Sequence, residues 1–134
     1  MTRASAEPCD KLPLQTVRSL RGIELDALRA WASRGSQSLI EVDLDRCTGK
    51  VEVLQAIARA FDLPSWFGMN LDALYDSLTD LPDTGMAAGY IVLLERLLRV
   101  RNFDREQRAA LLGVFRDVAE TYAQRGVPFR VLYS

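Results

Sequence analysis

The sequence contains no histidine and only two cysteines, Cys9 and Cys47. Histidine is the commonest general base and a common metal ligand near neutral pH, so its absence argues against acid–base catalysis and against most transition-metal sites. Two cysteines without a C-x-x-C pair cannot form a disulfide framework. We therefore expect a protein that is not an enzyme, uses no cofactor or metal, and keeps reduced thiols as cytoplasmic proteins do.

Long apolar segments are also missing. The longest strongly apolar run, Tyr90 to Leu94, is far shorter than the ~18 residues that a membrane-spanning helix needs. The first residues, Met1 to Glu7, lack the apolar core of a secretory signal. These absences predict a cytoplasmic protein that does not contact a membrane.

The remaining composition is that of a globular domain. The 134 residues are 49% hydrophobic and 26% charged, which is sufficient for one domain with its own core. Charge is distributed unevenly, because residues 41–83 hold nine acidic residues and only three basic ones, a net charge of −6. Such a stretch disfavours direct binding of nucleic acid and favours a cationic protein partner.

Hydrophobic periodicity predicts alternating strands and helices. We expect strands at 14–20, 39–44, 90–94 and 127–133, and helices at 23–32, 51–61, 70–81 and 104–126. Helical connections between strands predict an α/β fold with a parallel sheet. From residue 39 onward the order predicts a three-stranded parallel sheet packed by helices. Residues 1–38 are predicted to be an N-terminal extension of a tail, a strand and a helix.

The helix predicted after Asn70, a favoured N-cap residue, has two different sides. Its leucines cluster on one side, and Tyr75 lies at the rim. The other side carries an aspartate at every fourth position: Asp72, Asp76 and Asp80. Like charges at this spacing repel each other, and no basic residue lies between Arg59 and Arg96. Either a cation from a partner or a metal completes this stripe, or the stripe is an ordinary solvated face.

The segment before this helix carries two aromatic residues, Trp66 and Phe67, followed by Gly68. Exposed aromatic residues beside a charged patch are typical anchors of protein interfaces. The alternative is that they pack beneath the loop, which we expect for Phe67. Gly68 is expected to supply a backbone angle that other residues resist.

Residues 63–79, LPSWFGMNLDALYDSLT, resemble the signature of the barstar family, intracellular inhibitors of the secreted bacterial ribonuclease barnase. The resemblance continues through the apolar strand that ends at Glu95 and through residues 112–117, so it predicts a barstar-like inhibitor domain over residues 39–134. It implies that the helix and the preceding loop enter the active site of a basic ribonuclease or related nuclease toxin. A carboxylate of the inhibitor then takes the place of a substrate phosphate.

The resemblance also implies roles for particular residues. Asp76 occupies the position of the central phosphate mimic, and Asp72 that of a second acidic contact. The other positions implied to bind the partner are Trp66, Gly68, Asn70, Tyr75, Val114, Asp117 and Asp80. Asp117 is shorter than the glutamate of the family, and Asp80 replaces a glycine. These departures suggest a nuclease other than barnase itself.

Several other functions are compatible with the sequence. A barstar-like fold could serve an interaction or immunity protein whose target is a toxin or regulator other than a ribonuclease. Paired carboxylates also serve glycosidases and Mg²⁺ or Ca²⁺ sites, but histidine and EF-hand spacing are absent. Nucleic acid would have to use the arginines between Arg96 and Arg108, which alternate with acidic residues. We expect removal of residues 1–38 to leave inhibition intact, unless that segment completes the core.

Overall fold

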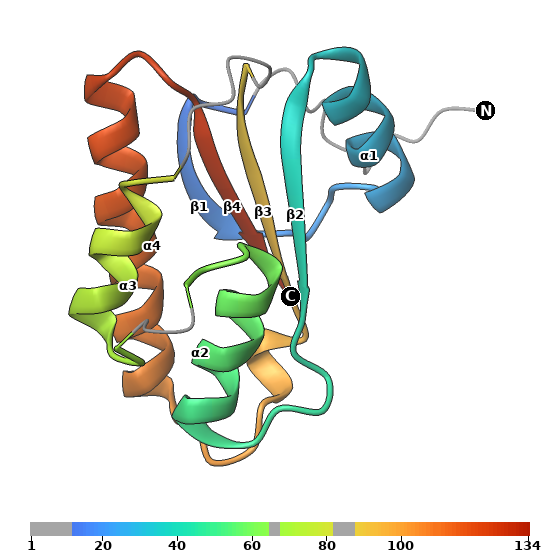
Figure 1. The fold of residues 1–134 in the computed structure, drawn as a ribbon. Coiled ribbons are helices and arrows are strands. Elements are labelled where there is room, and N and C mark those ends of the chain that lie inside the picture. The colour runs from blue at the N-terminus through green and yellow to red at the C-terminus, as the bar shows by residue number, and fades with distance from the viewer. Residues whose placement is uncertain (1–11, 65–67, 82–87) are drawn as a thin grey trace.

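The computed structural model describes residues 12–64, 68–81 and 88–134. In these residues strands and helices alternate along the chain, as the periodicity predicts (Figure 1). The elements are β1 (Gln15–Ser19), α1 (Leu25–Arg34), β2 (Gln37–Asp43), α2 (Gly49–Ala60), α3 (Leu71–Leu78), β3 (Gly89–Glu95), the short 3-10 helix η2 (Leu97–Arg99), α4 (Arg105–Gln124) and β4 (Phe129–Tyr133).

The described strands form one parallel sheet in the order β1-β4-β3-β2. The sheet therefore has four strands, and the prediction of three is wrong. The N-terminal strand β1 pairs with β4 along its whole length, from Gln15 opposite Phe129 to Ser19 opposite Tyr133. β1 joins the sheet because β4 would otherwise be an edge strand, with the backbone N–H and C=O groups of one side unpaired.

Both faces of the sheet are buried, as the continuous apolar run in β3 predicts. Val92 and Leu94 face a large core that they share with α2, α3 and α4. Ile91 and Leu93 point to the opposite face, where they pack with Leu28 and other residues of a smaller core. Successive side chains of a strand point to opposite faces, so one short run serves both cores.

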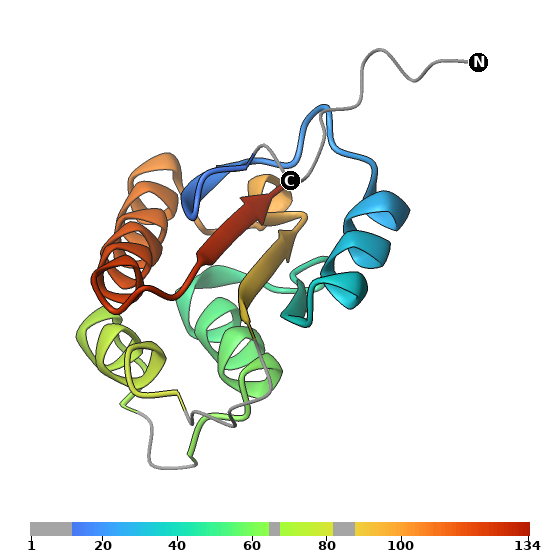
Figure 2. The same cartoon turned by 90° about the horizontal axis from the view of Figure 1, so that it is seen from above.

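The helices divide between these two faces. Seen from above, α2, α3 and α4 lie on one side of the sheet and α1 on the other (Figure 2). The chain passes from β1 at one edge, through α1, to β2 at the opposite edge. Arg29 of α1 also binds Glu41 of β2, with 2.7 Å between the guanidinium Nη2 and the carboxylate Oε1. Residues 12–34 therefore supply the edge strand β1 and cover one face of the sheet, whose other three strands come from residues 37–134.

Candidate functional site

Helix α3 begins where the sequence predicts, because Asn70 caps it. The Asn70 side chain accepts a hydrogen bond of 2.8 Å from the backbone N–H of Ala73. Leu74 and Leu78 are fully buried on the core side, whereas Asp72 and Asp76 are exposed. The predicted division of this helix into an apolar side and an acidic side is confirmed.

The helix ends earlier than predicted, at Leu78 rather than near Leu81. The hydroxyl of Thr79 donates to the carbonyl oxygen of Tyr75 at 2.9 Å. The backbone N–H of Asp80 donates to the carbonyl oxygen of Ser77, three residues before it, at 3.3 Å. Asp80 therefore lies beyond the helix. It lines a depression near Phe61 that Asp72 and Asp76 do not line.

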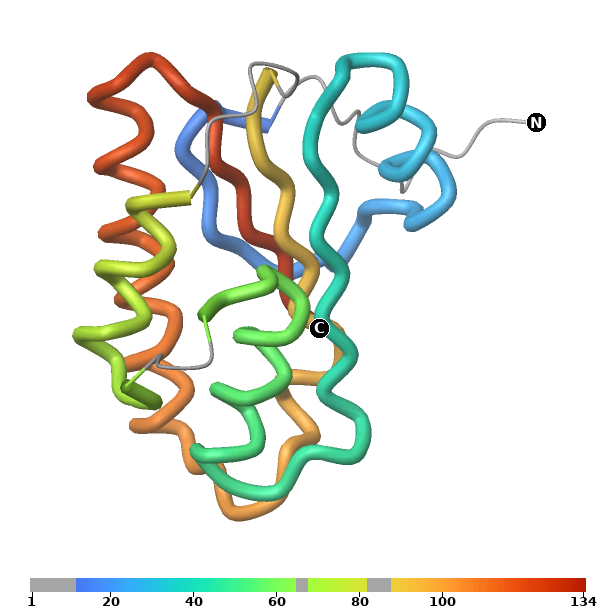
Figure 3. The backbone as a smooth tube through the Cα atoms, viewed as in Figure 1, coloured from blue at the N-terminus to red at the C-terminus, as the bar shows by residue number. Residues whose placement is uncertain are grey.

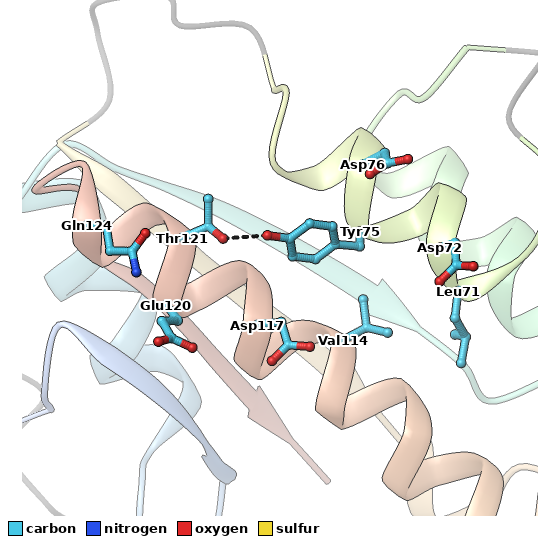
Figure 4. A pocket seen from close by; sticks show the side chains of 9 residues that line it. All are labelled: Leu71, Asp72, Tyr75, Asp76, Val114, Asp117, Glu120, Thr121 and Gln124. Atoms are coloured by element: carbon cyan, nitrogen blue, oxygen red, sulfur yellow. Dashed lines mark hydrogen bonds between the residues drawn. The ribbon is translucent and has the colours of Figure 1, made fainter.

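Three hydrogen bonds hold α3 against α4. The hydroxyls of Tyr75 and Thr121 are 2.7 Å apart (Figure 4). The hydroxyl of Tyr122 donates to the carbonyl oxygen of Leu78 at 2.6 Å. The guanidinium of Arg125 donates to the carbonyl oxygen of Thr79 at 2.7 Å. Because these bonds lie along one seam between the helices, they fix the separation of the side chains that both helices present to solvent.

An open groove of about 680 Å³ lies between α3 and α4. The described residues that line it are Leu71, Asp72, Tyr75, Asp76, Val114, Asp117, Glu120, Thr121 and Gln124 (Figure 4). Its four carboxylates come from two helices, and none of these lining residues is basic. A groove lined by charge of one sign focuses the electrostatic field and attracts a ligand of the opposite charge.

The structure brings together five of the residues implied to bind a partner. Asp72, Asp76, Tyr75, Val114 and Asp117 all line the groove, although α3 and α4 are far apart in the sequence. The two carboxylates of α3 and Asp117 are exposed, and Tyr75 and Val114 are partly buried at the floor. The side chain of Asn70 is engaged in capping α3 and donates to the carbonyl oxygen of Gly68 at 3.2 Å.

The structure shows a steric constraint at Gly68. In this turn the left-handed conformation is found at Met69, with φ of 54°. Gly68 is instead restricted by space, because an added Cβ would lie 3.3 Å from the side-chain nitrogen of Asn70 and 3.4 Å from the Cβ of Ala73. Trp66 and Phe67 lie outside the described residues.

Three polar residues of the groove, Glu120, Thr121 and Gln124, were missed by the sequence reasoning. On α4, Glu120 and Gln124 are exposed and Thr121 is partly exposed. Glu120 lies three residues after Asp117, and Gln124 lies seven residues after Asp117. This spacing places all three side chains on one side of a helix. The same periodicity argument that identified the aspartates of α3 would have found them on α4.

The arginines considered for nucleic acid are partly engaged within the fold. Arg96 binds Asp43 at 3.0 Å and Asp45 at 3.6 Å. Arg108 donates to the carbonyl oxygen of Phe103 at 3.1 Å. Within the described ranges no three acidic or cysteine side chains are arranged to hold a metal ion, and no helix is long and apolar enough to cross a membrane.

Comparison with known proteins identifies the family. Comparison with curated proteins gave no match. The sequence model of the family described as Barstar (barnase inhibitor) matches residues 37–134, which include β2, α2, α3, β3, α4 and β4. The matched segment contains every residue that lines the groove. The chain therefore belongs to the barstar family of barnase inhibitors.

Proposed function

We propose that this protein binds a basic ribonuclease and blocks its active site with the groove between α3 and α4. The observation that carries the proposal is the set of four carboxylates from two helices that line one open groove. Ribonuclease active sites bind phosphates, so they are rich in cationic side chains. Membership of a family of barnase inhibitors supports the same conclusion.

In this proposal Asp76 is the central phosphate mimic. Its carboxylate accepts hydrogen bonds from arginine or histidine side chains of the ribonuclease, and exclusion of water at the interface strengthens these bonds. Asp72 and Asp117 supply further negative charge from the two helices. Tyr75 and Val114 provide a partly apolar floor between them, and Trp66 is the aromatic anchor in the preceding loop. Asn70 and Gly68 hold the start of α3.

Residues 39–134 carry the inhibitory activity in this proposal. Glu120 extends the acidic lining along α4, and Asp80 forms part of the outer rim. The segment before residue 39 takes part in binding only by stabilising the fold, because α1 lies on the opposite face of the sheet from α3 and α4 (Figure 2).

The test is inhibition of purified cationic bacterial ribonucleases, barnase among them, by the wild-type protein and by Asp76→Asn. This substitution keeps the shape of the side chain and removes its charge. We expect the inhibition constant to rise at least 100-fold, about 3 kcal/mol, because the cations of the ribonuclease are left buried without a partner. The control is Asp26→Asn on α1, an aspartate whose side chain is 87% exposed and outside the groove, and it should inhibit as the wild type does.

The rate of association supplies a second measurement. It should fall steeply as salt is added, because the groove attracts its partner over a distance that dissolved ions screen. Equal inhibition by wild type and Asp76→Asn would remove Asp76 from the centre of the site. Failure to inhibit any of the ribonucleases would favour a toxin or regulator of another kind as the target.

A further inference from the structure

Gly113 has no evident reason to be a glycine within the fold. It lies in the interior of α4, where glycine is unfavourable because it loses the most backbone freedom on folding. Its φ is not positive, and a Cβ added to it would meet no atom within 4 Å. Gly113 is nevertheless only partly exposed. A helix with an alanine here would be more stable, and nothing among the described residues prevents it.

Gly113 lies between two recesses of the surface. Ala110, three residues before it, lines an apolar cavity, and Asp117, four residues after it, lines the acidic groove. Residues at these spacings are neighbours on one side of a helix. Leu71 of α3 lines both the cavity and the groove, so the two recesses form one continuous surface.

The apolar cavity has a volume of about 90 Å³, and its lining residues come from the first turns of α2, α3 and α4 and from Phe103. The N-terminal ends of these three helices lie near one another (Figure 3). Its apolar lining consists of Val53, Leu54, Leu71, Phe103, Ala110 and Leu111. An apolar cavity of roughly 150 Å³ holds a benzene molecule. The smaller volume here suits one aliphatic side chain better than an aromatic ring.

The polar residues of the cavity determine which kind of group it accepts. Lys50 and Gln107 also line it, and Lys50 is exposed. The ammonium group of Lys50 repels a second cation, whereas the carboxylates of the groove attract one. A basic protein that meets this surface therefore places its cation in the groove and an uncharged side chain in the cavity.

We propose that the ribonuclease-binding surface continues from the acidic groove across Gly113 into this cavity, which receives one aliphatic side chain of the ribonuclease. The missing side chain at Gly113 lets the backbone of the ribonuclease approach α4 closely between the two recesses. The inference rests on the proposed function, because it takes the groove as the site of the ribonuclease cation.

The first test is Gly113→Ala, measured with whichever purified cationic ribonuclease the wild type inhibits most strongly. We expect the melting temperature of the free protein to rise by about 3–6 °C, because the helix gains a better residue. We expect affinity for the ribonuclease to fall about tenfold or more, because the added methyl group occupies space that the partner needs. A stabilised variant with unchanged affinity would overturn the close approach at Gly113.

The second test compares Ala110→Leu with Ala109→Leu. Both alanines are exposed neighbours on α4, but only Ala110 lines the cavity. Ala110→Leu should fill the cavity and weaken binding about tenfold, and Ala109→Leu should bind as the wild type does. Equal affinities of the two variants would overturn the assignment of the cavity. If Asp76→Asn also leaves affinity unchanged, the proposed function fails as a whole, whereas loss of binding in Asp76→Asn alone restricts the failure to this inference.

Discussion

The two faces of the central sheet are equally buried but are covered by different elements. In β3 the side chains of Val92 and Leu94 on one face and of Ile91 and Leu93 on the other are all fully buried. The first face is covered by α2, α3 and α4, and the second by α1 and Leu12. The groove belongs entirely to helices of the first face. Burial alone therefore does not distinguish the face that carries the proposed binding site from the face that supports it.

The second face also contains a buried cation. Arg130 of β4 is 5% exposed, and its guanidinium lies 5.0 Å from the centre of the Trp31 ring. Its Nε donates to the carbonyl oxygen of Pro13 at 3.1 Å, and among the described residues its Nη1 has no hydrogen-bond partner. Burial lowers the pKa of Arg130. In the part of the chain that the structure describes, the partners of this guanidinium are one ring and one carbonyl oxygen, and a buried charge with few partners lowers the stability of the fold.

Removal of residues 1–36 should have the largest effect. It takes away β1, which pairs with β4 over five residues, and it exposes Ile91, Leu93 and Leu132. We expect the truncated chain to lose cooperative unfolding, because one apolar face and one sheet edge become accessible to water. This replaces the expectation from the sequence that removal of residues 1–38 leaves inhibition intact, because β1 and α1 complete the sheet and its second core. Thermal unfolding followed by circular dichroism checks this. A sharp transition at the temperature of the full chain would show that residues 37–134 fold without α1 and β1.

A matched pair of leucines tests the two faces separately. Leu28 of α1 and Leu74 of α3 are both fully buried. Each change to alanine should lower the free energy of unfolding by about 2–5 kcal/mol, as urea titration would measure. At a temperature where both variants are folded, only Leu74→Ala should weaken binding to the ribonuclease, since Leu74 supports the helix that carries Asp72 and Asp76. Weaker binding by Leu28→Ala would mean that the two faces are coupled.

Two substitutions between α3 and α4 test how rigid the proposed binding face is. Tyr75→Phe removes the hydroxyl that lies 2.7 Å from that of Thr121, and Thr121→Val removes its partner. Each should cost about 1 kcal/mol of stability, and a double-mutant cycle should give a coupling of about 1 kcal/mol. The same cycle measured on ribonuclease affinity should also show coupling if this bond fixes the groove. Additive effects on affinity would indicate that the groove is held by the other contacts of the seam.

The sequence predicted the strands and helices well because their signals are local. The continuous apolar run of β3 and the alternation in β2 identify strands by themselves, and Asn70 and Asp104 identify helix starts by their capping chemistry. The capping box of α4 is present, with Asp104 and Gln107 bonding each other's backbone at 2.8 Å. Periodicity cannot show which strands become neighbours. The position of β1 beside β4, and hence the four-stranded sheet, therefore needed the structure.

The residues of the candidate site were also predicted well where the signal is local and less well where it depends on packing. Its α3 half follows from one helix, in which Asp72 and Asp76 share a side. Of its α4 half, the family resemblance implied Val114 and Asp117, whereas Glu120 joins Asp76 only through the packing of the two helices, which no local pattern predicts. Asp80 shows the reverse error, because an ideal helical wheel assumes that the helix continues, whereas the hydroxyl of Thr79 bonds the last turn and the helix ends.

The smallest expected effect concerns three carboxyl groups on the α1 face, at the ends of β2 and β3. Burial raises the pKa of Glu95, and the negative charges of Glu41 and Asp43 raise it further. A hydrogen bond from Arg29 lowers the pKa of Glu41. The signs of their contributions to stability are therefore opposite. The contribution of Glu95 is present at low pH and is lost as the pH rises above about 4.5, the ordinary value for glutamate. That of Glu41 is present at higher pH and is lost as the pH falls below that value.

Glu95→Gln removes the charge that this face accommodates poorly and keeps a side chain of the same size. Its melting temperature should exceed that of the wild type at pH 7, and the difference should shrink towards pH 4, where Glu95 is protonated in the wild type. Glu41→Gln should behave in the opposite sense, with a deficit at pH 7 that shrinks as the pH falls. Thermal unfolding at one-unit intervals from pH 4 to 8 distinguishes the two. Curves for both variants that run parallel to that of the wild type would show that Glu41 and Glu95 contribute no pH dependence to stability.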